Sequence, residues 1–277
     1  MNTLENSVAR HYGDDELLSR ILAGLEAIGA DLDQLSPDDL TPVEEFHIGG
    51  RNATIHAVEK MALQTGQHVL DIGCGIGGAA RYIASSTGCT VTGIDLTEEY
   101  IAIAKVLTDM TGLANSARFE VSNALAMPFP DTSFDAAITL HVAMNIESRD
   151  ALYREIARVL KPGAVLCLFD VMKKGDEALE FPVPWAASED TSHLATPEET
   201  CGYLEAAGFD VQEVWDRTGF ALDFFREGMA AAAQAPQPLG IHLVMGDSAA
   251  EKLKNVKVNI ECDRIAPVQM IAKRKAK

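Results

Sequence analysis

Short runs of consecutive apolar residues alternate along the chain with longer stretches in which apolar residues recur every three or four positions. The short runs predict buried strands, and the longer spacing predicts amphipathic helices. Strands are expected at residues 68–72, 90–95, 117–121, 134–140, 164–170, 208–215 and 265–272. Helices are expected between them, and this alternation is typical of an α/β fold with a doubly wound, mostly parallel sheet.

The first predicted strand leads directly into clustered glycines, with the sequence Val-Leu-Asp-Ile-Gly-Cys-Gly-Ile-Gly-Gly at positions 69–78. Backbone N–H groups at such a strand-to-helix turn can face a ligand, and glycine allows a close approach. The glycine spacing also matches the dinucleotide fingerprint of nicotinamide and flavin enzymes, so it selects no cofactor by itself. Asp71, however, places a negative charge near the first glycine and favours a cationic ligand over a pyrophosphate.

The segment from Leu70 to Gly77 resembles the first motif of the class I S-adenosylmethionine-dependent methyltransferases. That motif has an acidic residue followed by Gly-x-Gly-x-Gly, and the family's cofactor carries an ammonium and a sulfonium. The resemblance implies a Rossmann-like, seven-stranded sheet with an antiparallel edge strand. It also implies S-adenosyl-L-methionine as the cofactor, held by Asp71, Gly73, Gly75 and Gly77.

A second carboxylate ends the next predicted strand. Asp95 lies 20 residues after Gly75, the spacing at which an acidic side chain meets a ribose diol. An alternative is that Asp95 caps the helix predicted to begin near Thr97. The resemblance would place Leu96 against the adenine ring.

A third segment, residues 119–131, resembles the part of the family in which an Asp-Ala pair contacts adenine. Here the pair is Asn123 and Ala124, and the Asn amide oxygen can still accept a hydrogen bond from the adenine amino group. The turn at Lys161 to Ala164 also resembles the family's Lys-Pro-Gly-Gly turn, with its last glycine replaced. The strong part of the resemblance covers about residues 60–172.

The chain outside this core is expected to choose the substrate. Residues 1–60 are predicted to form a helical lid, and residues 61–277 the cofactor-binding domain, with substrate-side insertions at 173–200 and 219–257. Loops of this kind carry binding residues and ordinary surface polar groups about equally often. The candidate substrate contacts are Tyr12, His47, Arg51 and Trp185. For Trp185, cation–π contact with an ammonium and simple packing are both open.

His141 follows the fourth predicted strand and is the candidate catalytic base. Methyl transfer is an in-line displacement that depends mainly on alignment, and some acceptors must also lose a proton. Histidine is the usual acid or base near neutral pH. The alternative is that His141 only bonds a backbone carbonyl.

Within the superfamily, the chain looks most similar to sarcosine/dimethylglycine N-methyltransferases, which implies a small amine as the acceptor. One departure weakens this assignment, because Asn145 stands where that branch tends to have a histidine. Methylation of oxygen or carbon in a quinol, polyketide or other small metabolite therefore stays open. Two other classes also remain, a non-catalytic S-adenosylmethionine-binding sensor and an NAD(P)-dependent oxidoreductase.

The amino-acid composition argues against several classes of binding partner and site. The formal charge of −18 and the dispersed Lys and Arg residues argue against nucleic acid, whose phosphates need clustered cations. Five scattered cysteines without a Cys-x-x-Cys pair suggest neither a metal site nor a disulfide framework. With no apolar run of the ~20 residues that a membrane span needs, and no export signal at the amino terminus, a cytoplasmic protein is expected. A homodimer is compatible with these features.

Overall fold

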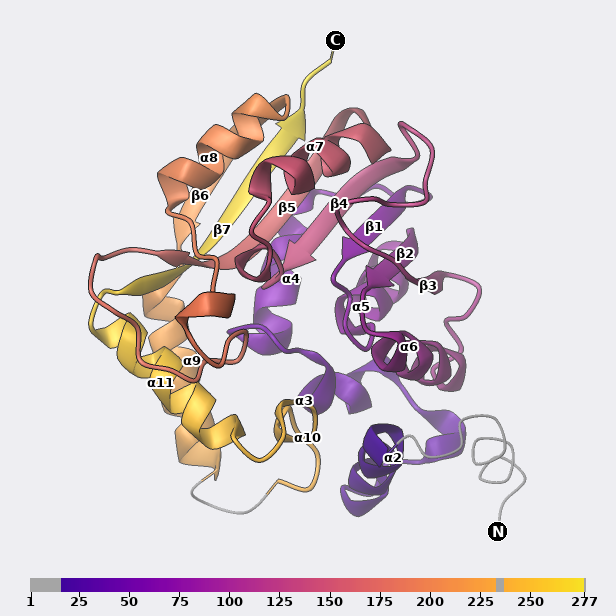
Figure 1. Cartoon of the computed structure of the whole chain (residues 1–277). Helices are drawn as coiled ribbons and strands as arrows, with labels where there is room; N and C mark the ends of the chain where they lie inside the picture. Colours follow the sequence, from indigo (N-terminus) through magenta and orange to yellow (C-terminus); the bar gives the residue numbers. More distant parts are fainter. Residues whose placement is uncertain (1–15, 233–236, 277) are drawn as a thin grey trace.

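The residues that the structure describes form one seven-stranded sheet with the strand order β3-β2-β1-β4-β5-β7-β6. The computed structural model describes residues 16–232 and 237–276 (Figure 1). The strands are β1 (His68–Ile72), β2 (Thr90–Asp95), β3 (Ala117–Val121), β4 (Phe134–Leu140), β5 (Leu160–Lys173), β6 (Phe209–Asp216) and β7 (Ile265–Arg274). All pairs from β3 to β5 are parallel, whereas β7 runs antiparallel to both β5 and β6.

The expected α/β class and the mostly parallel sheet are confirmed. The reversed strand β7 lies second from the edge, between β5 and the edge strand β6 (Figure 1). β5 is longer than the pattern predicts, and its residues Val165 to Lys173 pair with residues 265–273 of β7. The Lys-Pro-Gly turn forms an irregularity within β5, where the register against β4 shifts.

Helices cover both faces of the sheet and extend beyond its carboxyl edge. They are α2 (Glu16–Ala27), α3 (Thr41–Glu44), α4 (Gly50–Met61), α5 (Gly78–Thr87), α6 (Glu98–Met110), α7 (Arg149–Val159), α8 (Pro197–Ala206), α9 (Thr218–Ala232), α10 (His242–Met245) and α11 (Ala249–Glu261). Short 3-10 helices occur at η1 (Leu32–Gln34), η2 (Pro37–Leu40), η3 (Ala143–Asn145) and η4 (Glu189–Thr191).

Two apolar layers hold the sheet. One layer packs α7 and α8 against the sheet through residues such as Leu152, Ile156 and Leu204. The other layer packs α4, α5 and α6 against the opposite face, where Val58 and Met61 of α4 join the core. The domain boundary expected after residue 60 falls at the end of α4, so in the structure this helix belongs to the layer on the sheet.

Two further apolar clusters lie beyond the carboxyl edge of the sheet. The first joins α2 to α6, with Leu18 and Ile21 among the buried residues of α2. The second joins α9, α11 and the loop after β5, with Val183 and Phe225 buried. In Figure 1 the strands β1 and β4 point downward toward α3, α10 and α11, and β7 points upward toward the carboxyl terminus.

The strand order reverses between β1 and β4, which are neighbours in the sheet although two strands separate them in sequence. In open α/β sheets, ligands bind at the carboxyl ends of the strands at such a switch point. The glycine turn after β1 and His141 after β4 therefore come together at this edge.

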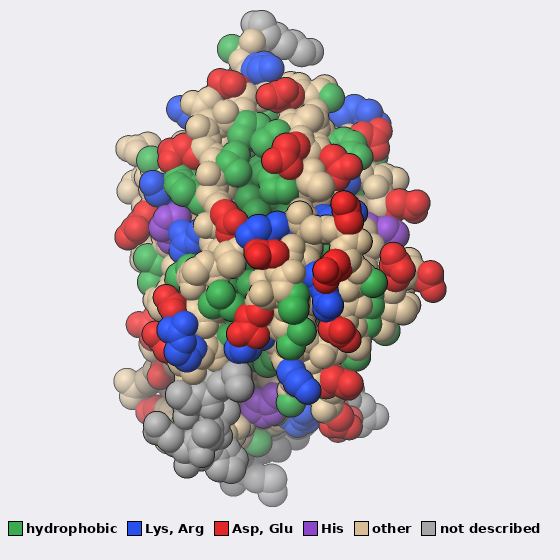
Figure 2. Space-filling view, turned by 90° about the vertical axis from the view of Figure 1, so that its left-hand side faces the viewer, with side chains coloured by type: hydrophobic (Ala, Val, Ile, Leu, Met, Phe, Trp, Pro, Cys, Tyr) green, Lys and Arg blue, Asp and Glu red, His purple; other side chains and the backbone are tan. Residues whose placement is uncertain are grey.

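On the face shown in Figure 2, lysines and arginines lie singly among more numerous acidic side chains. None of the helices in the described part of the chain is long and apolar enough to cross a membrane. All five cysteines lie within the described residues and are free.

Candidate functional site

A cavity of about 870 Å³ opens at the carboxyl ends of the parallel strands. We distinguish a polar end and an apolar end of this cavity. The polar end is formed by Asp71, Gly73, Gly75, Asp95 and Asn123. The apolar end is formed by Trp185, Phe224, Phe225, Val244, Met245, Leu253 and Val256. Figure 1 places α11 and the strands β2 and β3 on opposite sides of the molecule.

Most of the residues predicted from the sequence line this cavity. They are His47, Asp71, Gly73, Gly75, Asp95, Leu96, Asn123, Ala124, His141 and Trp185. Gly77 and Arg51 are not among the lining residues. Tyr12 lies outside the described residues.

The glycine turn requires glycine for two different reasons. Gly73 has a φ of 72°, and a Cβ there would lie 2.3 Å from Cγ2 of Val142, which follows β4. Gly77 has a φ of 91°, and its Cβ would lie 2.7 Å from Nη1 of Arg81 and 2.8 Å from Cζ of Phe119. Gly73 thus permits the close approach of the two strand ends, whereas Gly77 permits packing behind the turn. The contact of Gly77 with a ligand stays a prediction, and the structure adds this packing role.

Asp71 is a buried carboxyl that faces the cavity, with 2% of its surface exposed. Its Oδ2 atom has no hydrogen-bond partner among the described residues. Burial, reinforced by Asp95 and Glu45, raises its pKa from 3.8 to about 7. An ionised carboxylate in such a place is costly without a cation, so the polar end is suited to a positively charged ligand group.

Asp95 accepts hydrogen bonds from two backbone N atoms, and its contact with a ribose diol stays a prediction. Its Oδ1 accepts a hydrogen bond from the Thr97 backbone N at 2.9 Å, at the start of α6. Its Oδ2 accepts one from the Gly75 backbone N at 3.0 Å and so ties β2 to the glycine turn. Carboxylate oxygens accept more than one hydrogen bond, so a ligand diol can still bind. The side chain of Leu96 beside it is 69% exposed and offers a flat apolar surface to a ring.

Asn123 is exposed at the edge of the cavity, and its Oδ1 accepts a hydrogen bond from the Leu125 backbone N at 2.9 Å. This local bond holds the loop after β3 in shape and uses one lone pair of the oxygen. Ala124 is partly buried and packs on the core cluster below. An adenine contact at this amide oxygen would therefore share the atom with the loop.

His141 and His47 face each other at the cavity. Their ring centroids are 6.0 Å apart, and each ring also lies against Phe169. Nε2 of His141 is buried and has no partner among the described residues, so no backbone carbonyl binds it there. Burial, assisted by His47, holds the pKa of His141 well below its usual range. The imidazole is therefore neutral near pH 7.

Asp170 fixes the turn that carries His141. Its Oδ1 accepts hydrogen bonds from the backbone N atoms of Val142 at 2.8 Å and Ala143 at 3.2 Å. These bonds stabilise the left-handed backbone of His141, whose φ is 56°. Burial raises the pKa of Asp170 to about 6, against the opposing effects of Arg149 and the two backbone donors.

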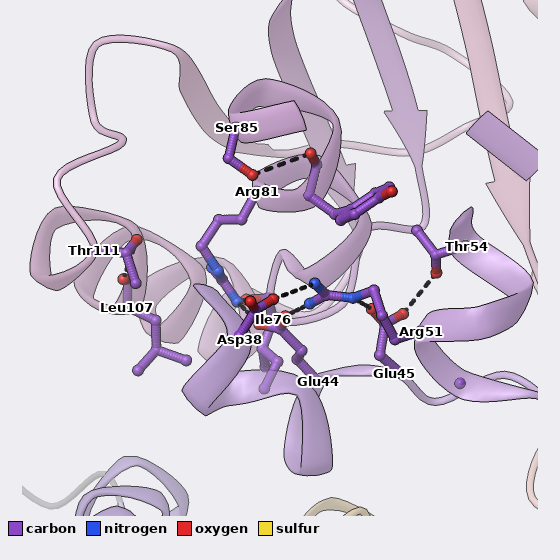
Figure 3. Close-up of polar contacts among 12 residues, drawn as sticks. Asp38, Glu44, Glu45, Arg51, Thr54, Ile76, Arg81, Ser85, Leu107 and Thr111 are labelled. Carbon is purple, nitrogen blue, oxygen red and sulfur yellow. Dashed lines mark hydrogen bonds and ion pairs between the residues drawn. The ribbon is translucent and has the colours of Figure 1, made fainter. Parts of the chain in front are cut away.

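A buried ionic network links the segment before α4 to the glycine turn (Figure 3). Nη2 of Arg81 donates to Glu44 Oε2 at 2.5 Å and to the Ile76 carbonyl at 2.8 Å. Arg51 donates from Nη2 to Glu44 Oε1 and from Nε to Glu45 Oε1, both at 2.5 Å. Oε2 of Glu45 accepts a hydrogen bond from Thr54 Oγ1 at 2.8 Å.

This network assigns Arg51 a different role from the predicted one. Its guanidinium is bound to two buried carboxylates and does not line the cavity, so it is not a substrate contact in this structure. The physical reason is that Glu44 and Glu45 are themselves nearly inaccessible and need a cation. Arg51 orients these two carboxylates, which do line the cavity.

Both predicted insertions reach the apolar end. Trp185 from the loop after β5 donates from Nε1 to Ser192 Oγ at 3.0 Å, which fixes the indole at the wall of the cavity. Helices α9, α10 and α11 supply most of the remaining wall. Among the described residues, no three His, Cys, Asp or Glu side chains are arranged to hold a metal ion.

Comparison with known families identifies the core of this architecture. Residues 70–168 match the family model described as a methyltransferase domain. These residues form a class I methyltransferase domain. The matched range contains the glycine turn, Asp95, Asn123 and His141, and the inserted walls of the apolar end lie outside it.

Several curated proteins are similar to the chain that carries this methyltransferase domain. One is methyltransferase GfsG of Streptomyces halstedii, 29% identical over 183 residues, with 65% of each chain covered. The match thus spans less than two thirds of GfsG. Others are named as a sterol C-methyltransferase, an O-methyltransferase and a phosphoethanolamine N-methyltransferase. The accepting atom therefore differs among the relatives.

Solved structures show the same fold. The [4+2]-cyclase SpnF superposes with a TM-score of 0.67 at 24% identity, covering 94% of this chain and 93% of SpnF. Phosphoethanolamine N-methyltransferase 2 of Haemonchus contortus, solved with S-adenosyl-L-methionine, has a TM-score of 0.70 at 22% identity, covering 100% and 61%. A candidate sarcosine dimethylglycine methyltransferase of Galdieria sulphuraria has 0.67 at 16%, covering 81% and 86%. At these identities the likeness concerns the fold alone.

Sequence reasoning missed four residues of this methyltransferase domain and its surroundings: Glu44, Glu45, Arg81 and Asp170. Each is an ionisable residue inside an apolar or glycine-rich stretch, which is a signal of functional burial that a sequence can show. What the sequence does not show is the pairing, since Glu44 and Arg81 are 37 positions apart.

Proposed function

We propose that the protein is an S-adenosylmethionine-dependent methyltransferase that acts on a small molecule. The observation that carries this proposal is the buried, unpartnered Oδ2 of Asp71 at the polar end of the cavity. A carboxylate there would repel a pyrophosphate and attract a ligand with an ammonium and a sulfonium. The domain match over residues 70–168 supports the same assignment.

Each residue of the polar end has a part in holding the cofactor. Asp71 balances its positive charge, and the Gly73 to Gly75 turn gives its backbone close access. Asp95 binds the ribose diol, and Leu96 with Asn123 and Ala124 lies along the adenine. When bound, the cofactor supplies an activated methyl group that moves in line to the acceptor as the carbon–sulfur bond breaks.

The protein's own contribution to the reaction is alignment, exclusion of water and removal of a proton. His141 is neutral, and its buried Nε2 is without a partner in the described part of the chain, so it is suited to accept a proton from the acceptor. Burial keeps the pKa of His141 well below its usual range, and the neighbouring His47 adds to this effect. Residues 44–48 line the cavity and help to keep water out.

The sequence predicts a small amine, of the sarcosine or dimethylglycine type, as the acceptor. Two observations favour methylation of oxygen or carbon in a larger metabolite as an alternative. The first is the aromatic and aliphatic lining of the apolar end, which a small hydrophilic amine would not fill. The second is the range of accepting atoms among the relatives.

Two other activities are separated by experiment. A sensor would bind the cofactor without transferring its methyl group. The [4+2]-cyclase SpnF has the same fold, and a fold alone does not determine the reaction. A nicotinamide enzyme would have to place a pyrophosphate near Asp71, which charge repulsion opposes.

The test is transfer of a labelled methyl group from S-adenosylmethionine to a panel of acceptors, with the Asp95→Ala variant as control. The panel contains glycine, sarcosine, dimethylglycine, phosphoethanolamine, catechols and a short-chain quinol. Labelling of one acceptor class that the control loses would support the proposal and choose the acceptor. Binding of S-adenosylhomocysteine without any labelling would favour the sensor, and displacement of S-adenosylhomocysteine by a nicotinamide cofactor would refute the proposed cofactor.

A further inference from the structure

The apolar end of the cavity contains a single Lys or Arg side chain among the residues described as lining it. That residue is Lys252 of α11. Its Nζ donates a hydrogen bond to the Met245 carbonyl at 3.2 Å, at the end of α10. The other lysines of α11 are placed differently, since Lys257 pairs with Glu261 and Lys254 is exposed and does not line the cavity.

The wall around Lys252 is apolar on several sides. Leu253 and Val256 are its neighbours on α11, Val244 comes from α10, and Phe224 and Phe225 come from α9. Phe225 is 6% exposed and Val256 is 1% exposed, so these side chains are packed into the protein and present a firm surface. A site with this lining binds apolar area and uses its few polar groups to orient the ligand.

The charge of Lys252 is unusual in its surroundings. The protein has a formal charge of −18, and the polar end of the cavity presents carboxylates. None of the residues lining the cavity from α9, α10 and α11 is acidic in the described part of the chain. The acidic residues that line the cavity belong to other parts of the described chain, namely Glu44, Glu45, Asp71, Asp95 and Glu147.

We infer that the methyl acceptor is a molecule with an extended apolar body and a negatively charged group, and that Lys252 binds this group. The inference rests on the proposed function, since it concerns the acceptor side of the same cavity. It differs from the small-amine prediction, because the apolar end supplies a cation where an ammonium would need an anion. The body of the acceptor lies along α9 to α11, and its reacting atom points toward His141.

The experiment measures binding of three probes that share one apolar chain, namely decanoate, decan-1-ol and decylammonium. Titration calorimetry is done on the full chain with saturating S-adenosylhomocysteine, whose own binding is measured first. Decanoate is expected to bind at least about fivefold more tightly than decan-1-ol, as a charge-assisted hydrogen bond to Lys252 adds to the shared apolar contact. Decylammonium is expected to bind most weakly.

Three variants test whether Lys252 binds the charged group of the probe. Lys252→Met is expected to remove the preference for decanoate and to leave decan-1-ol within about twofold. Lys252→Glu is expected to reverse the order, so that decylammonium binds more tightly than decanoate. Lys254→Met, on the same helix but outside the cavity, is the matched control and is expected to keep the original order.

Three results would overturn the inference: an equal loss in the Lys254→Met control, decylammonium binding as tightly as decanoate in the unmodified protein, or no binding of any probe while S-adenosylhomocysteine binds. A different result would reject the proposed function. Absence of S-adenosylhomocysteine binding, with decanoate still bound through Lys252, would reject the methyltransferase proposal and leave the anion site intact.

Discussion

At the polar end of the cavity, the groups that face a ligand come from the ends of β1, β2 and β3, whereas at the apolar end they come from the loop after β5 and the helices after β6. The polar end depends on backbone turns and on carboxylates held by neighbouring strands. The apolar end depends on side chains that different helices bring together. Since the family match covers only the first set, the difference indicates that cofactor binding and acceptor choice are built by separable parts of the chain.

The largest effect is expected at the buried network behind the polar end. Arg81→Met leaves Glu44 buried without one of its cations, and removing one partner of a buried ion pair costs about 3–5 kcal/mol. The free energy of unfolding, measured by urea denaturation, should fall by that order. The double variant Arg81→Met with Glu44→Gln should recover part of the loss. Equal stability of the single variant and the unmodified protein would mean that the network contributes nothing to the fold.

Between the two ends of the cavity, the variant His141→Asn should lower the rate of methyl transfer without weakening cofactor binding. Asparagine tolerates the left-handed backbone at this position, so the turn should survive. If His141 accepts the proton, methyl transfer should fall at least ~100-fold. Affinity for S-adenosylhomocysteine should stay within about twofold. Nearly normal turnover in this variant would remove His141 from the mechanism.

Asp71→Asn sharpens the comparison by changing the charge of the polar end alone. Affinity for S-adenosylhomocysteine should fall about 10-fold or more, because the ligand's ammonium loses its buried counter-charge. Decanoate binding at the apolar end should be unchanged. A parallel loss of both ligands would show that the two ends are not separable.

The raised pKa of the Asp71 carboxyl predicts how stability depends on pH. Its pKa is about 7 in the folded protein and about 3.8 when unfolded, so between these values the folded state holds the proton more tightly. This group's contribution is therefore complete below about pH 4 and is lost as the pH rises to about 7. The unmodified protein should lose more stability between pH 5 and pH 8 than Asp71→Asn does, as urea denaturation at each pH would reveal. An identical pH slope in both proteins would contradict the raised pKa.

The smallest effect is expected from Leu96→Ala. The side chain is 69% exposed, so stability should change by less than about 0.5 kcal/mol. If adenine covers this side chain, affinity for S-adenosylhomocysteine should fall about threefold to tenfold by calorimetry. The matched control is Val121→Ala, another exposed apolar residue that does not line the cavity. Equal affinity in both variants would place the ring elsewhere.

The local pattern of the chain determines the α/β class, most strand bounds and the candidate polar end. β1, β2, β3 and β4 occupy the predicted ranges, because each is a short apolar or alternating stretch bounded by turn residues. Asp71, Gly73, Gly75 and Asp95 were identifiable for a related reason. Asp71 and Asp95 lie at the carboxyl ends of β1 and β2, and Gly73 and Gly75 lie in the turn after β1, so a short stretch of sequence identifies each of them.

Only the tertiary structure decides which distant side chains become partners. Arg51 has the sequence appearance of an available cation, yet Glu44 and Glu45 bind it in a buried network. At Gly77, Phe119 of β3 and Arg81 of α5 leave no room for a side chain, and the local sequence does not show these neighbours. Lys252 is one of several lysines on α11 in sequence and gains its place at the cavity from the packing of α9, α10 and α11. The physical reason is that hydrophobic periodicity specifies which face of an element is buried, whereas pairing of charges depends on how separate elements pack together.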